Sequence, residues 1–106
     1  MEMREERNDK TLTISLSGAV DSTNYEDVER ETDACIEKDN SFESLCFNVA
    51  DVNYVSSAGL RMFSHFNQKM KHEGKGYSII KASKELYKIF NITGYTSAFT
   101  VQMADD

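Results

Sequence analysis

Residues 51–63 read DVNYVSSAGLRMF, and within them the spacing of the apolar residues changes from that of a strand to that of a helix. Two hydroxyls, those of Ser56 and Ser57, therefore lie at the turn between a buried strand and a helix start. A helix start has unpaired backbone N–H groups and the positive end of the macrodipole, so it favours an anion. A serine at such a turn is either a plain N-cap or a hydroxyl that gains and loses a phosphate.

The bulk composition is that of one soluble globular domain spanning residues 1–106, with 40% hydrophobic and 28% charged residues. Twelve basic and 18 acidic residues give a formal net charge of −6, which argues against a nucleic acid or an anionic membrane as partner. An acidic surface suits a basic protein partner, although it also serves solubility alone.

Two cysteines, Cys35 and Cys46, lie inside apolar patterns, as expected for reduced thiols in a cytoplasmic protein. Residues 2–7 are mostly charged, so no signal peptide is expected. No apolar run approaches the roughly 18 residues that a membrane span needs.

The N-terminal part alternates with period two over residues 11–17, which predicts a half-buried strand ended by Gly18. Residues 3–7 are expected to pair with it as a short edge strand. Helical spacing then predicts a helix over residues 25–36, with N-cap candidates in the run 21–23.

The second half alternates strands and helices. Residues 45–49 are nearly all apolar, as expected for a central strand covered on both faces, and residues 45–82 form a parallel strand–helix–strand unit. The remaining expectations are a helix after the serine turn, a strand over 77–80, a helix capped by Ser83 and closed by Gly94, and a strand over 99–103. The predicted fold is a small α/β layer, with helices packed against a mixed sheet of four to five strands.

Catalytic and metal-binding patterns are absent from the sequence. His65 lies eight residues after Ser57, which is about 12 Å along a helix axis and too far for a catalytic hydrogen bond. Cys35 and Cys46 have no metal-ligand spacing, and no nucleotide-binding glycine motif occurs. We therefore expect no cofactor and no metal, and a protein that is not an enzyme.

The run Ser56-Ser57-Ala58-Gly59-Leu60-Arg61, placed after the apolar strand, resembles the signature of the STAS family, and in particular that of the bacterial anti-sigma factor antagonists. Residues 18–21, GAVD, resemble the family's Gly-Glu-Leu-Asp. Ile92-Thr93-Gly94 with Phe99 resembles its C-terminal landmark. These three landmarks occur in the family's order and cover essentially the whole chain.

The resemblance implies partner switching. An unphosphorylated antagonist of this type binds an anti-sigma factor that is also a serine kinase, phosphorylation of a serine ends the binding, and a serine phosphatase resets the cycle. Alignment through Gly59 and Leu60 implies Ser57 as the phosphoacceptor, with Ser56 as the alternative. Asp21 is implied as a recognition residue on a neighbouring loop.

The resemblance further implies that Ser56, Ala58 and Gly59 shape the partner-binding turn, where Gly59 lets the partner's backbone or nucleotide come close. Arg61 is an additional candidate contact, as are Asn53 and Tyr54. The chain departs from the commonest family pattern, because Ser56 stands at the aspartate position and Ala58 precedes the glycine. A monomer is expected for a small switching partner.

Two other functions are considered beside the switch. One is a phosphorylation-independent STAS scaffold or ligand-sensing module in a signalling complex, and the other, more distant, is a hydrolase. Phosphate on Ser57 would take the net charge from −6 to roughly −8. Because a helix N-terminus tolerates that charge, its effect is expected at the interface with the partner and not on folding.

Overall fold

The computed structural model describes residues 2–104. They contain one five-stranded sheet, in which the strands lie in sequence order. The elements along the chain are β1 (Glu2–Asn8), β2 (Thr11–Val20), α1 (Tyr25–Lys38), β3 (Ser44–Val55), α2 (Ser57–His72), β4 (Gly76–Ala82), α3 (Lys84–Ile92), the short 3-10 helix η1 (Tyr95–Ser97) and β5 (Thr100–Met103). Strands β1 and β2 are antiparallel, and β2 to β5 run parallel. The expected α/β fold with a mixed sheet is confirmed, including the edge strand that pairs with β2.

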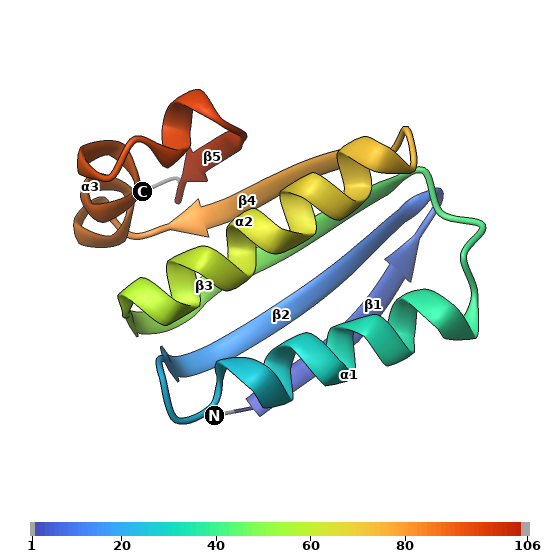
Figure 1. Ribbon diagram of the computed structural model, residues 1–106, viewed down its shortest axis with the longest axis horizontal. Helices are drawn as coiled ribbons and strands as arrows, with labels where there is room; N and C mark the ends of the chain where they lie inside the picture. Colours follow the sequence, from blue (N-terminus) through green and yellow to red (C-terminus); the bar gives the residue numbers. More distant parts are fainter. Residues whose placement is uncertain (1, 105–106) are drawn as a thin grey trace.

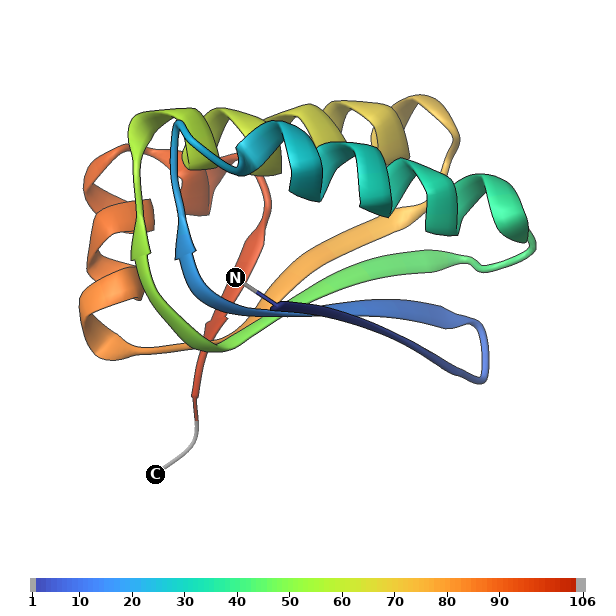
Figure 2. The same cartoon turned by 90° about the horizontal axis from the view of Figure 1, so that it is seen from below.

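The helices lie on one face of the sheet. Helices α1 and α2 run side by side above β2 and β3, and α3 stands at the end of the sheet where β3 finishes (Figures 1 and 2). Within residues 2–104 no helix covers the other face, so the expectation that residues 45–49 are covered on both faces is wrong. Leu45, Phe47 and Val49 are buried beneath the helices, whereas Cys46 lies between Thr13 and Ser78 in the sheet register. These two neighbours shield the Cys46 thiol on the open face, which explains why an apolar run occurs in a strand with one bare side.

Aromatic rings fill the space between the sheet and the helices. The Phe47 ring on β3 meets the Phe63 ring on α2 edge to face at 5.1 Å, and Phe63 contacts Phe90 on α3 at 5.8 Å. All three rings are fully buried. Such ring contacts stabilise a core in addition to the area that they bury. This cluster therefore links β3 to α2 and α2 to α3.

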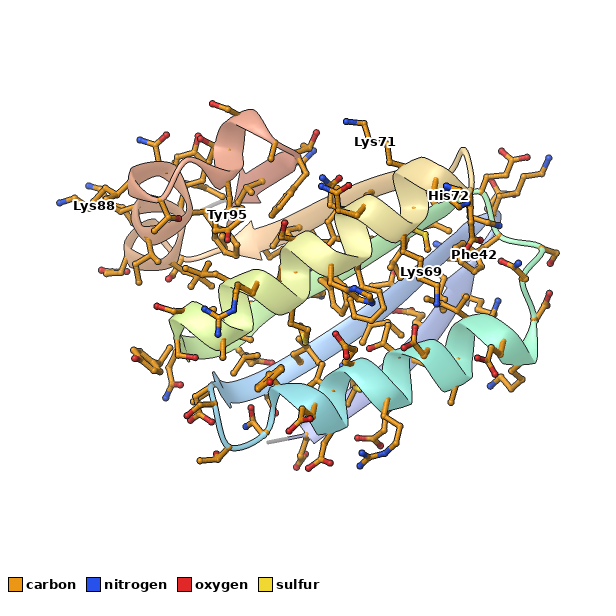
Figure 3. The ribbon with its side chains drawn as sticks, in the orientation of Figure 1. Phe42, Lys69, Lys71, His72, Lys88 and Tyr95 are labelled. Atoms are coloured by element: carbon orange, nitrogen blue, oxygen red, sulfur yellow. The ribbon has the colours of Figure 1, made fainter. Side chains whose placement is uncertain are left out.

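Helix α1 is held against α2 and β1 by charged groups. Lys69 on α2 lies between the two helices (Figure 3) and its Nζ donates to Asp33 Oδ1 at 2.8 Å. On the opposite side, Glu5 of β1 accepts from Arg7 Nε at 2.7 Å and from Lys38 Nζ at 2.6 Å. The inward side chains of β1 therefore tie the edge strand to the C-terminal end of α1.

Two local expectations about β2 and α1 are corrected. Gly18 does not end the strand: it has a φ of 88° and lies at a register shift, so β2 kinks and continues to Val20. Helix α1 has Asn24 as its N-cap residue and none of residues 21–23. The Asp21 side chain instead bonds to Thr23, which closes a local turn before the helix.

The C-terminal part follows the expectations closely. Ser83 caps α3 by accepting from Leu86 N at 3.1 Å, and Gly94, with a φ of 84°, follows the helix end. Phe99 is buried but precedes the strand, which begins at Thr100.

Burial predicts how two isoleucines differ in their contribution to stability. Ile79 on β4 is fully buried, whereas Ile92 at the end of α3 is 73% exposed. Ile79→Ala should lower the free energy of unfolding by about 2–5 kcal/mol, because it leaves a cavity, and Ile92→Ala by less than about 0.5 kcal/mol. Urea titrations of both variants measure the difference, and equal midpoints would contradict this packing.

The charges around Glu5 predict a pH dependence of stability. Hydrogen bonds from Lys38, and next from Arg7, lower the pKa of Glu5 from 4.5 to about 2. A carboxyl whose pKa is lower in the folded state stabilises the fold above its unfolded pKa, and this contribution is lost as the pH falls toward the folded value. Glu5→Gln should therefore be less stable than the parent at pH 7, with the difference shrinking between about pH 4.5 and 2. Urea titrations across that range test this, and a constant difference would be the opposite result.

Candidate functional site

The candidate site lies where β2 and β3 end side by side. Val20 and Val55, the last residues of the two parallel strands, are paired in the register. Each strand leads directly into the loop or turn before its helix. The loop with Asp21 and the turn with Ser56 and Ser57 therefore meet at the end of the sheet where β2 and β3 finish. The Ser56 N–H donates to the Val20 carbonyl at 2.9 Å, which fixes one segment against the other.

Ser56 caps helix α2. Its backbone is extended, its Oγ accepts from the Gly59 N–H at 3.3 Å, and its carbonyl accepts from the Leu60 N–H at 2.9 Å. The Ser56 hydroxyl is therefore already part of the helix start.

Ser57 is the first residue of α2 and is exposed. Among the side-chain hydrogen bonds of residues 2–104, none involves the Ser57 hydroxyl. The first turn of α2 contains no acidic residue, so no side chain of that turn offsets the positive end of the helix. Of the two serines, Ser57 is the more exposed, and its hydroxyl is not the one that caps the helix.

Asp21 is held in its ionised form beside this turn. Its Oδ1 accepts from Thr23 Oγ1 at 2.6 Å and from Thr23 N at 2.9 Å. These bonds lower the pKa of Asp21, the side-chain bond contributing most. The carboxylate is half exposed and therefore brings a negative charge to the same end of the sheet as Ser57.

Gly59 has an internal role in addition to the expected one. It is buried, and a Cβ there would lie 2.6 Å from the Val20 carbonyl oxygen and 2.9 Å from Val55 Cγ1. The group that approaches Gly59 within this chain is β2, and the close approach of a partner at Gly59 stays a prediction. Ala58 is only 7% exposed, so it too shapes the turn from inside.

Arg61 is exposed one turn into α2. Because residues four apart share a helix face, Arg61 lies on the same side as Ser57. Across residues 2–104 it takes part in no ion pair. Tyr54, which precedes the turn, is 52% exposed and offers an aromatic surface next to it.

The structure adds Asn24 to the residues that the sequence singles out. Its side-chain oxygen accepts from the Asp21 N–H at 2.9 Å, and its side-chain nitrogen donates to the Ala19 carbonyl at 2.8 Å. The signal in the sequence is the asparagine that directly precedes the first helical residue, one position after the run considered for capping.

His65 does not lie with the serines. Its Nε2 is 3.8 Å from Glu29 Oε1 on α1, and its ring contacts Phe66. Residues 2–104 contain no group of three or more His, Cys, Asp or Glu side chains placed to hold a metal ion. None of the described helices is long and apolar enough to cross a membrane.

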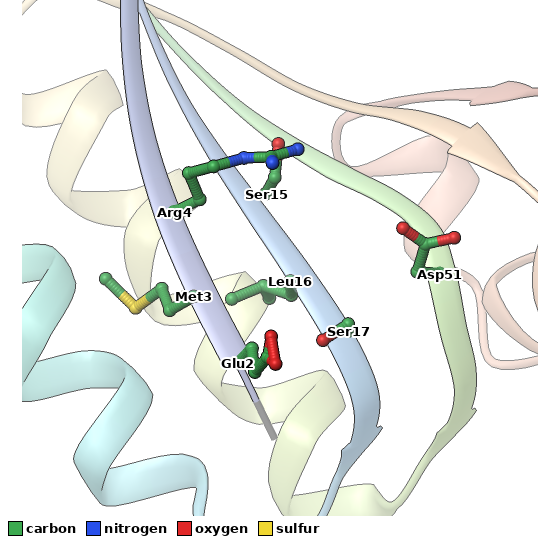
Figure 4. A pocket seen from close by; sticks show the side chains of 7 residues that line it. All are labelled: Glu2, Met3, Arg4, Ser15, Leu16, Ser17 and Asp51. Carbon is green, nitrogen blue, oxygen red and sulfur yellow. The ribbon is translucent and has the colours of Figure 1, made fainter.

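A depression of about 330 Å³ lies on the open face of the sheet, away from the serine turn (Figure 4). Its lining includes Arg4 on β1, Ser15 and Ser17 on β2, and Asp51 on β3. No residue of the serine turn contributes to it.

The comparison with known proteins agrees with this fold. The STAS domain family model matches residues 2–105. The chain belongs to the STAS domain family. A curated relative, BtrV of Bordetella bronchiseptica, is named as a candidate anti-sigma factor antagonist and is 26% identical over 101 residues, which cover 95% of this chain and 85% of BtrV.

Solved structures share the fold of this STAS domain. An anti-sigma factor antagonist from Mycobacterium paratuberculosis superposes with a TM-score of 0.85 at 19% identity, covering 95% of this chain and 84% of that one. The unphosphorylated form of the antagonist SpoIIAA superposes with a TM-score of 0.73 at 14% identity, covering 99% and 90% of the two chains. The Bacillus SpoIIAA in its phosphorylated form gives 0.72 at 14% identity, covering 98% and 93%.

The close approach at Gly59 predicts the cost of adding one methyl group. Gly59→Ala places a Cβ against the Val20 carbonyl, so α2 must shift away from β2, and the free energy of unfolding should fall by about 1–3 kcal/mol. The control is Ser57→Ala in the same turn, which should change it by less than about 0.5 kcal/mol. Thermal and urea unfolding of both variants measure this, and a Gly59→Ala protein as stable as the parent would refute the close contact.

Proposed function

We propose that this STAS domain is an anti-sigma factor antagonist that acts by partner switching. In its unphosphorylated form it binds an anti-sigma factor that is also a serine kinase. The STAS domain acts in the cytoplasm and as a monomer. The kinase transfers the γ-phosphoryl group of ATP to Ser57 Oγ, which releases ADP and a proton. A serine phosphatase then hydrolyses the phosphoserine with water, which restores the hydroxyl and releases inorganic phosphate.

The observation that carries the proposal is the difference between the two serines. Ser56 Oγ is bonded to the Gly59 N–H, while Ser57 is exposed at the first position of α2. A kinase reaches the Ser57 hydroxyl without opening the turn. The names of BtrV and of the solved antagonists support the same role.

The electrostatics of the turn support a switch without a large conformational change. A phosphate on Ser57 adds about −1.5 to −2 charges next to the free N–H groups of α2 and on the same helix face as Arg61. The fold tolerates the charge there. A docked partner would have to desolvate it or bring a cation to it, and each 1.4 kcal/mol of that cost weakens binding tenfold.

The partner surface in this proposal consists of the exposed groups on both sides of the turn, Asp21, Ser57 and Arg61, with Ser56 at its edge. Ala58 and Gly59 contribute by setting the path of the backbone. The acidic Asp21 favours a basic group on the kinase, which agrees with the net charge of −6.

The alternative is a phosphorylation-independent STAS scaffold or ligand-sensing module. The open face of the sheet, with the depression that includes Arg4, Ser15 and Ser17, is the surface that would serve it. In that case Ser57→Ala would leave regulation unchanged.

The phosphorylation site is tested by mass. We expect the histidine-kinase-like serine kinases of the same organism, supplied with ATP, to add one phosphate that peptide mapping locates on Ser57. The phosphate should be absent from Ser57→Ala and present on Ser56→Ala, whose lost cap costs about 1 kcal/mol. A phosphate on Ser56 would move the acceptor by one residue, and no phosphate with any of these kinases would favour the scaffold.

The effect on binding is tested with the kinase that passes this assay. Ser57→Ala should stay bound in the presence of ATP, while Ser57→Asp should bind at least roughly tenfold more weakly. The thermal midpoint of Ser57→Asp should stay near that of the parent, because the helix start tolerates the charge. A large fall of that midpoint would instead indicate a purely structural serine.

A further inference from the structure

The last two residues of β2, Ala19 and Val20, and the residue that follows them, Asp21, each make a hydrogen bond to a group outside the strand. The Ala19 carbonyl accepts from Asn24 Nδ2 at 2.8 Å, and the Val20 carbonyl accepts from the Ser56 N–H at 2.9 Å. The Asp21 N–H donates to Asn24 Oδ1 at 2.9 Å. Asn24 makes two of these three bonds, so its side-chain amide joins the start of the loop to the end of β2. The third bond, from Ser56, joins the end of β2 to the serine turn.

The Asn24 side chain is not used for the usual purpose of an N-cap asparagine. Such a side chain normally accepts from a backbone N–H in the first turn of the helix that it precedes. Asn24 occupies the N-cap position of α1 but makes no bond of this kind. Its donor faces backward to Ala19 in β2 and its acceptor to Asp21, just after β2. This pairing needs a carbonyl and an NH₂ group on one side chain.

We propose that Asn24 is a positioning residue of the switch, which holds Asp21 at the place where the partner meets the serine turn. This inference rests on the proposed function, in which Asp21 contacts the kinase. Asn24 fixes the backbone of Asp21, and Thr23 fixes the side chain by occupying Oδ1. In the proposed complex, Oδ2 meets a cationic or N–H group of the partner.

The charged state of Asp21 fits this role. The Thr23 bonds that orient the carboxylate also lower its pKa, so the group stays ionised at neutral pH. A carboxylate that is oriented before binding loses less conformational freedom when the partner docks. Without the Asn24 side chain, the Asp21 N–H would lose its acceptor, and the backbone that carries the carboxylate would be held less firmly relative to Ser57.

The first test needs no partner. In Asn24→Ala, hydrogen exchange of the Asp21 amide should become at least roughly tenfold faster, because its acceptor is gone, while exchange of the Ser56 amide stays slow. Asn24→Asp keeps an oxygen for the Asp21 N–H and should recover slow exchange. The control is Ser83→Ala, which removes the cap of α3 and should leave Asp21 unaffected. Unchanged exchange at Asp21 in Asn24→Ala would overturn the inference.

The second test uses the kinase identified by phosphorylation of Ser57. Asn24→Ala should lower kcat/KM for phosphorylation roughly tenfold, as expected for a contact that is no longer oriented. In a background of Asp21→Ala the same change should have almost no further effect, because there is no carboxylate to position. Equal losses in both backgrounds would mean that Asn24 merely stabilises the fold, and that result also overturns the inference.

The two tests separate this inference from the proposed function. If no kinase phosphorylates the parent protein, partner switching fails, and the inferred role in the switch fails with it. The exchange measurement then still reports whether Asn24 holds the Asp21 backbone. If Ser57 is phosphorylated and Asp21→Ala has no effect on kcat/KM, the switch stands and the inference is overturned.

Discussion

The candidate site depends on one backbone carbonyl, that of Val20. It accepts the Ser56 N–H at 2.9 Å, and it is also the atom that a Cβ on Gly59 would meet at 2.6 Å. The first contact joins the turn before α2 to the end of β2, and the second sets how closely the helix approaches the strand. Asp21 directly follows Val20, and Ser57 directly follows Ser56, whose N–H is bound to the Val20 carbonyl. The carbonyl therefore fixes the backbone next to both residues.

The arrangement separates residues that build the turn from residues that face outward. Gly59 and Ala58 are buried and Ser56 is bonded within the helix start, whereas Ser57 and Arg61 are exposed on one face of α2. A chemical change at Ser57 therefore falls on the surface without disturbing the packing beneath it. The stabilising contacts and the exposed groups thus belong to different side chains, so a change at the surface of the turn leaves the fold intact.

Much of the fold could be predicted from the sequence because its apolar periods are strong: the alternation over residues 11–17, the helical spacing over residues 25–36 and the cap at Ser83 all indicate the right element. The errors have local physical causes. Gly18 reads as a strand end, but its positive φ serves a kink inside β2. The apolar run of β3 suggested cover on both faces, yet Cys46 is shielded by its strand neighbours. Asn24 could not be found as a positioning group, because its two bonds run back to Ala19 and Asp21 and only the folded loop brings these groups together.

The two edges of the sheet bear on how this chain behaves at high concentration. An exposed edge strand offers unpaired N–H and C=O groups to any other chain, and long flat edges lead to aggregation. Here β1 carries Glu2, Arg4 and Glu6 in alternation, and β5 is only four residues long. One edge is thus protected by charge and the other by its shortness. Both features lower the tendency of this chain to pair its sheet with that of another copy at high concentration.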